Sequence, residues 1–236
     1  YAAYELPDAP DECRLYLAAG DITEMQGIEV LVNSENTYMQ MARIFETRSL
    51  SSKLRWHGAQ KARNGHVRED TVQQELYEMV KTDPYMLPIQ LGSVVPTHAG
   101  HKDSRLVENG ARYIFHVATV AVRLNPSDDL EPATNADIRG AVTSCLNEVL
   151  QVDKVSGRIS PENTARWAEE EAAAASYEAI KSIIFPLFAS GRGGRETEAD
   201  RRAITQTMLS SIRDFVSRPR NKARLKLKAI HLCAFS

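Results

Sequence analysis

The sequence predicts an α/β fold in which helices cover both faces of a central sheet. Runs of β-branched and aromatic residues alternate along the chain with amphipathic segments, which is typical of such a sheet. The composition, with 43% hydrophobic and 25% charged residues, is that of an ordinary folded protein. We expect the 236 residues to form a single domain over 1–236, and two smaller domains are the less favoured alternative.

In the first half of the chain, two predicted strands precede two predicted helices. Residues 14–18, RLYLA, alternate in polarity before a turn at Gly20, and residues 28–33 form a second apolar run. Apolar residues between 39 and 63 recur at helical spacing, with an interruption near 47–52. Residues 71–80 predict another helix, which the pair Asp83-Pro84 stops.

The second half continues the alternation. Strands are predicted at 92–97, 112–122, 182–188 and 226–235, and residues 98–110 are expected to be a loop. Residues 135–151 carry apolar side chains at helical spacing behind a candidate cap, Asn135. The Ala- and Glu-rich residues 167–181 predict a helix after a polar loop at 152–163, and a further helix follows Gly194.

Charge and cysteine content limit the classes of partner. A net charge of −2 and a pI near 6.4 give no general attraction to nucleic acid, so we expect no nucleic-acid partner. Three cysteines without CxxC spacing predict reduced thiols in the cytoplasm, with no disulfide framework. The six histidines lack metal-ligand spacing, so we expect no metal. We also expect no cofactor.

The sequence also bears on the membrane and on the extent of the chain. No run reaches the roughly 18 apolar residues of a membrane helix, so we expect no membrane contact by this segment. Because the chain begins at Tyr1 without Met, we expect a fragment of a larger protein, and a preceding membrane segment is left open.

Polar residues follow three of the predicted strands. They are Gly20 to Thr23, the two asparagines Asn33 and Asn36, and the glycine-rich loop Ser190 to Gly194. Glycines allow close backbone approach, and N–H groups at a following helix start favour a phosphate. The loop lacks the Walker ending and the dinucleotide G-x-G-x-x-G spacing, and its alternative role is a tight turn. Since ligands bind beyond the carboxyl ends of strands in open α/β sheets, the three segments together predict one ligand site.

These segments resemble a known family. GDIT at 20–23, VLVNSEN at 30–36, YIFHVAT at 113–119 and SIIFPLFASGRGG at 182–194 resemble, in order and spacing, the landmark segments of macrodomains. The resemblance spans nearly the whole chain. It implies a three-layer α/β/α fold with a central mixed sheet that binds ADP-ribose or a related nucleotide at the strand ends.

The resemblance implies a role for each matching residue. Asp21 would accept a hydrogen bond from the adenine amino group, and Ile22 would offer its backbone N–H. Asn33 lies in the strand-end position of the family's NAAN motif, and Asn36 would face the distal ribose. The diphosphate loop would consist of Ser190, Gly191, Arg192, Gly193 and Gly194, and Phe235 would stack on the adenine or lie at its edge. The alternatives are a turn cap for Asp21, an Asx turn for Asn36 and a core position for Phe235.

One stretch departs from the family pattern. Where many macrodomains have a glycine run after the second asparagine, this chain has bulky residues: Tyr38, Met39, Met41 and Phe45. The distal half of the site is therefore expected to be rebuilt, with Tyr38, Met39 and Met41 lining a pocket for an added group and Glu35 or Arg43 pairing with its charges. The alternative, favoured for Met41 and Phe45, is that these side chains belong to the core, as His116 is expected to do.

Two classes of function follow from the resemblance. The first is a binding module that senses ADP-ribose or an ADP-ribose-derived, NAD-derived signal, similar to the macro-type sensor domains of bacterial Thoeris antiviral defence, which respond to TIR enzymes. A homo-oligomer formed on ligand binding is left open. The rival is an ADP-ribosylhydrolase, acting on ADP-ribosylated targets or O-acetyl-ADP-ribose, in which Asn36 orients a water. No catalytic residue is assigned, and a scaffold for protein contacts is a third alternative.

Overall fold

The central element of the structure is a mixed sheet of eight strands. In the computed structural model, which describes residues 2–6, 9, 13–46, 48–81, 87–122, 130–151, 179–188 and 197–234, the strands follow the order β1-β2-β10-β9-β3-β7-β6, with β8 pairing to β7. Strands β2, β10, β9, β3 and β7 are mutually parallel, whereas β1, β6 and β8 pair antiparallel to their neighbours. Their bounds are β1 (Ala2–Glu5), β2 (Arg14–Ala19), β3 (Val30–Asn36), β6 (Val94–His98), β7 (Tyr113–Val122), β8 (Leu130–Pro132), β9 (Ser182–Pro186) and β10 (Ala229–Ala234).

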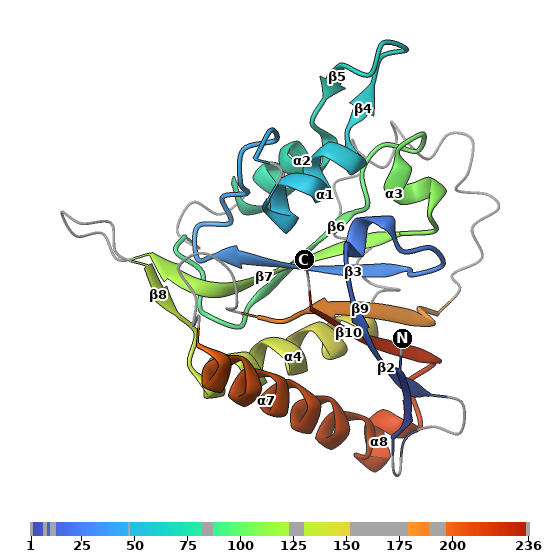
Figure 1. Ribbon diagram of the computed structural model, residues 1–236, viewed down its shortest axis with the longest axis vertical. Helices are drawn as coiled ribbons and strands as arrows, with labels where there is room; N and C mark the ends of the chain where they lie inside the picture. The colour runs from blue at the N-terminus through green and yellow to red at the C-terminus, as the bar shows by residue number, and fades with distance from the viewer. Residues whose placement is uncertain are drawn as a thin grey trace.

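Helices cover both faces of this sheet, as Figure 1 shows. One face carries α4 (Asn135–Val149), α7 (Glu198–Val216) and the short α8 (Pro219–Lys222), and the other carries α1 (Leu50–Gly58), α2 (Thr71–Lys81) and α3 (Arg105–Glu108). Strand β3 contributes to both cores: Val30 and Val32 pack in the α4/α7 core, and Leu31 packs in the α1/α2 core. This alternation follows from the period of two in a strand. The predicted three-layer α/β/α arrangement with a mixed sheet is confirmed.

Most predicted elements are present, with shifted bounds. Strand β3 continues to Asn36, so that Asn33 lies inside the strand and not at its end. The predicted helix between 39 and 63 is restricted to α1, and the predicted loop 98–110 contains α3. Helix α4 is capped by the hydroxyl of Thr134, and Asn135 is the first helical residue. The predicted helix at 167–181 lies almost wholly outside the described residues.

A small hairpin outside the main sheet was not predicted. It pairs β4 (Gln60–Lys61) with β5 (Val67–Glu69) and projects beyond α1 and α2, as Figure 1 shows. Only Ala59 separates the hairpin from Gly58, the last residue of α1. The Gly58 carbonyl oxygen accepts hydrogen bonds from the Thr71 hydroxyl and the His101 N–H, both at 2.8 Å. A Cβ atom on Gly100 would lie 2.1 Å from that oxygen, so glycine is required there. The hairpin therefore leaves the domain from a tightly packed anchor.

Candidate functional site

The candidate site lies at the end of the sheet where four parallel strands, β2, β10, β9 and β3, reach their carboxyl ends. We call this the strand-end edge; it is marked by Asp21 after β2 and by Asn36 at the end of β3. Two strands, β10 and β9, lie between β2 and β3. Three inter-strand spacings of about 4.8 Å separate the two ends by roughly 14 Å.

Asp21 lies in a sharp turn after β2. Gly20 has φ of +130°, a conformation that favours glycine, and Asp21 then caps a short 3-10 helix, η1 (Ile22–Glu24). The Asp21 Oδ1 atom accepts hydrogen bonds from the Thr23 N–H at 2.9 Å and the Thr23 hydroxyl at 2.7 Å. Ile22 is fully buried in the core, so only its backbone faces the turn. Asp21 therefore caps a turn, and its role toward a ligand stays a prediction.

Lys53 is a partner of Asp21 that sequence reasoning missed. Its Nζ atom lies 2.7 Å from Asp21 Oδ2, and both side chains are about three-quarters buried. Burial acts to raise the pKa of Asp21, but the hydrogen bonds from Lys53 and Thr23 and the Lys53 charge outweigh it, so the pKa is lowered. Asp21 is an ionised carboxylate held by helix α1. The only hint in the sequence was a lysine on a predicted helix, and nothing there linked it to a residue 32 positions earlier.

Asn36 closes a local turn. Its Oδ1 atom accepts from the N–H of Tyr38 at 2.8 Å and of Gln40 at 3.4 Å, and its Nδ2 atom donates to the Gln40 carbonyl at 3.2 Å. The next turn residue, Met39, has φ of +54°, where a side chain is uncommon. The Asx turn that the sequence offered as an alternative is confirmed.

The bulky residues after Asn36 divide into two groups. Met39 and Met41 are buried in the α1/α2 core, so the core alternative holds for Met41. Phe45 is 72% exposed, and the core expectation for it is wrong. Tyr38 is half-buried beside the Asn36 turn. The stretch after Asn36 therefore lies partly in the core and partly at the surface.

A buried polar network lies beneath the strand-end edge. Asn33 Nδ2 donates to Glu35 Oε1 at 2.7 Å and lies 3.2 Å from His116 Nδ1, while His116 Nε2 lies 3.0 Å from the Thr97 hydroxyl oxygen. Asn33 Oδ1 is buried with no hydrogen-bond partner among the described residues. Asn33 is thus fully buried and supports the end of β3 from inside the sheet. The cause is the longer strand, which turns this residue toward α1 and α2.

Burial disfavours the charged forms of both ionisable members of this network. Burial raises the pKa of Glu35 to about 7, although hydrogen bonds from Ser51 and Asn33 and the Arg55 charge partly oppose it. Burial lowers the pKa of His116 to about 3, and the core role expected for His116 is confirmed. Since Nδ1 accepts from Asn33, Nε2 carries the proton and donates to Thr97. Because Glu35 is buried and bonded to Asn33 and Ser51, it is not available for a ligand's charges, contrary to one expectation.

Helix α1 connects the network to the loop that follows Asn36. The Ser51 hydroxyl donates to Glu35 Oε1 at 2.5 Å and accepts from the Ala42 N–H at 3.1 Å. Arg55 donates to the Ala42 carbonyl at 2.5 Å and pairs with Asp70. One side of α1 therefore fixes the loop after Asn36, and Lys53 on the same helix holds Asp21.

The remaining predicted site residues are not placed. Ser190, Gly191, Arg192, Gly193, Gly194 and Phe235 lie outside the described residues, and their roles stay predictions. In the described parts of the chain, no helix is long and apolar enough to cross a membrane. The same residues contain no group of three His, Cys, Asp or Glu side chains placed to hold a metal ion.

Comparison with known proteins adds structural matches. No family model and no curated protein matches the sequence. Among solved structures, the chain is similar to an Oceanobacillus iheyensis macrodomain with ADP, at 14% identity and a TM-score of 0.60, over 100% of this chain and 88% of that one. It is also similar to a Trypanosoma brucei macrodomain in complex with ADP-ribose, at 15% identity and a TM-score of 0.55, over 94% and 64% of the two chains. The macrodomain of Thermus aquaticus DarG matches at 13% identity and a TM-score of 0.51, over 93% and 97%.

These matches span almost the whole chain at very low identity. The chain has a macrodomain fold.

Proposed function

We propose that this chain binds ADP-ribose, or a nucleotide derived from it, along the strand-end edge, and that it acts as a sensor and not as a catalyst. The observation that carries the proposal is the ionised Asp21 carboxylate at the end of β2, in a fold whose solved examples include complexes with ADP and with ADP-ribose. In the proposed pose, Asp21 and the Ile22 backbone hold the adenine.

The Asp21 carboxylate has room for a further donor. Its two oxygens offer about four acceptor positions, and Thr23 and Lys53 use three of them. An adenine amino group would occupy the fourth. Because Lys53 keeps the carboxylate ionised, the hydrogen bond to the amino group would be charge-assisted.

The order of the strands gives the proposed ligand a direction. The predicted diphosphate loop, Ser190 to Gly194, follows β9 in the sequence, and Phe235 follows β10. Both strands lie between β2 and β3 in the sheet. A nucleotide with its base at Asp21 would therefore extend past β10 and β9 toward Asn36 and Tyr38, over roughly 14 Å.

The Asn36 turn favours binding over hydrolysis. A carboxamide that already bonds the N–H groups of Tyr38 and Gln40 is committed to its own loop, so it is poorly placed to orient a water. The buried Met39, in place of a glycine, also prevents a close backbone approach to a distal ribose. The rival function is an ADP-ribosylhydrolase. Turnover of ADP-ribosylated substrate by the parent chain, lost in Asn36→Asp, would establish it.

The loop that follows Asn36 supports a narrower form of the proposal. Half-buried Tyr38 and the exposed Gln40 lie at the end of the edge where a group attached to the distal ribose would be. A nucleotide signal made from NAD by a TIR enzyme, as in Thoeris-like bacterial defence, has the required chemistry. In this form, the chain binds the modified nucleotide more tightly than plain ADP-ribose.

Isothermal titration tests the proposal. The parent chain is titrated with ADP-ribose, with ADP and with the nucleotide products of a TIR enzyme, and then Asp21→Ala is titrated with the tightest ligand. Loss of one charge-assisted hydrogen bond should weaken binding about 10- to 100-fold.

The matched control is Asp214→Ala, which removes an exposed carboxylate from α7. Circular dichroism of each variant checks that it is folded. If Asp21→Ala binds as tightly as the parent, or if no adenine nucleotide binds the parent, the proposed site is wrong.

A further inference from the structure

The chain carries a concentrated positive charge that its overall composition hides. Residues 41–69, from the rebuilt loop through the β4–β5 hairpin, contain seven Lys and Arg and two Glu, a net charge of +5. The whole chain has a net charge of −2. The expectation of no attraction to nucleic acid was drawn from that average, which does not describe this segment.

Two of these positive charges pair with carboxylates, and those of the hairpin do not in the part of the chain that the structure describes. Lys53 pairs with Asp21, and Arg55 pairs with Asp70. Lys61, Arg63 and Arg68 are all exposed, and none has a carboxylate within 4 Å among the residues that the structure describes.

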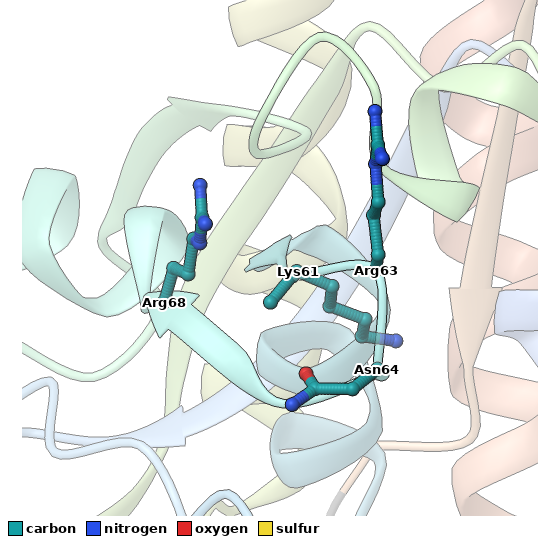
Figure 2. A pocket seen from close by; sticks show the side chains of 5 residues that line it. Lys61, Arg63, Asn64 and Arg68 are labelled. Carbon is teal, nitrogen blue, oxygen red and sulfur yellow. The ribbon is translucent and has the colours of Figure 1, made fainter.

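The unpaired cations surround an open hollow of about 590 Å³. Lys61, Ala62, Arg63, Asn64 and Arg68 line it, and in Figure 2 the Arg63 and Arg68 side chains extend upward, with Lys61 and Asn64 lower in the view. This volume is within the range that holds a nucleotide-sized group. The lining offers cations and one amide, and it suits an anionic ligand.

An aromatic ring lies beside the same cations. Trp56, near the end of α1, is 40% exposed, and the Lys61 Nζ atom lies 4.5 Å from the centre of its ring. Burial and the nearby Arg105 guanidinium lower the pKa of Lys61, as expected where positive charges are crowded. A partly exposed indole next to unpaired cations is the combination that binds a stacked base together with its phosphates.

We propose that the β4–β5 hairpin binds single-stranded nucleic acid, with the phosphates on Lys61, Arg63 and Arg68 and one base stacked on Trp56. A single strand fits better than a duplex, because its bases are free to reach an aromatic side chain. This activity is separate from the proposed nucleotide site, since none of the hairpin's lining residues is one of the predicted ligand residues on the strand-end edge.

Fluorescence anisotropy with a labelled single-stranded oligonucleotide tests the proposal. We expect Arg63→Ala/Arg68→Ala to weaken binding about tenfold and to reduce the salt slope of log K by about 1.4, since each phosphate contact on a single strand contributes about 0.7. Trp56→Leu should also weaken binding about tenfold, through lost stacking, and should leave the salt slope unchanged.

The matched control is Lys222→Ala/Arg224→Ala, which removes two exposed cations near α8, at the opposite end of the molecule in Figure 1. Binding by this variant should stay within about twofold of the parent, because the charge lost lies beyond the screening distance. An equal loss in the control and the hairpin variant overturns the proposal.

Two further outcomes also overturn it. In the first, Trp56→Leu binds like the parent, and inorganic polyphosphate or an acidic peptide displaces the oligonucleotide as well as unlabelled oligonucleotide does at equal concentration of negative charge. The surface then selects polyanions in general and not nucleic acid. If no anisotropy change occurs at about 50 mM salt, there is no such surface. Titration of the same variants with ADP-ribose measures the strand-end edge independently, so each proposal fails or stands by its own readout.

Discussion

Replacing Glu35 by glutamine tests the buried network directly. The Glu35 carboxyl is 5% exposed and accepts hydrogen bonds from Ser51 and Asn33. Its pKa is raised from 4.5 to about 7 by burial, so its ionised form destabilises the folded protein. Glutamine is nearly isosteric and neutral at every pH. The Glu35→Gln variant should therefore escape a cost that the parent carries at neutral and alkaline pH.

The pH range of the effect follows from the direction of the pKa shift. Below about pH 4.5 both states hold the Glu35 proton, and there is no cost. As the pH rises toward about 7, the unfolded chain loses the proton while the folded protein keeps it, so the free energy of unfolding falls. Above that pH both are ionised and the cost is constant. The shift of the pKa corresponds to about 3 kcal/mol.

In the parent protein alone, the pH dependence of the free energy of unfolding does not reveal the contribution of Glu35. The pKa of His116 is lowered from 6.5 to about 3, so His116 makes stability rise with pH up to about 6.5. Between pH 4.5 and 6.5 the two groups contribute slopes of opposite sign, each of about 1.4 kcal/mol per pH unit. Only the difference between variant and parent isolates Glu35.

Urea unfolding followed by circular dichroism from pH 4.5 to 8.5 measures that difference. The variant's advantage should grow by about 3 kcal/mol across the range, on top of a constant loss of about 1 kcal/mol for one hydrogen bond weakened by the amide. Glu46→Gln, at an exposed position, is the control and should give a constant difference. A constant difference for Glu35→Gln as well would refute the raised pKa of the buried Glu35 carboxyl.

Two further predictions concern the packing of the domain. Gly100→Ala should lower the free energy of unfolding by about 2–4 kcal/mol, since φ is +106° and the added Cβ would meet the Gly58 carbonyl. Gly140→Ala, in an open position within α4, should raise the free energy of unfolding by up to about 1 kcal/mol. Thermal unfolding of the pair checks this, and equal melting temperatures would contradict the close contact. Thr134→Ala removes the cap of α4 and should cost about 1 kcal/mol in urea unfolding, whereas Thr134→Ser should cost little.

The layers of the fold could be predicted from the sequence because strong periodicities produced them. The β-branched run at 113–122 is β7, and the apolar spacing after 135 is α4. The hairpin at 60–69 could not be predicted in this way, because its strands contain two and three residues and carry exposed charges. The position of such short paired strands depends on where the preceding helix ends. Here α1 ends at Gly58, which packs closely against Gly100.

The candidate site was predictable only in part, for a related reason. Asp21 was found because a Gly-Asp turn after a strand is a local signal. Lys53 and Ser51 were not found, since their roles depend on a helix lying across the strand ends, which is a long-range contact. Asn33 was placed at a strand end because asparagine disfavours strands, and its buried partners in β3 and β7 overrode that preference.

The position of β10 has a consequence for synthesis of the chain. This strand, residues 229–234, comes last among the described strands and yet lies between β2 and β9 in the sheet. During synthesis, β2 lacks its parallel neighbour β10 until more than 200 further residues have been added. The Gly20 N–H likewise lacks its hydrogen-bond partner, the Ala234 carbonyl, until then. The turn that holds Asp21 therefore reaches its final form only after β10 has been synthesised, and nascent chains truncated before residue 229 should lack a formed site.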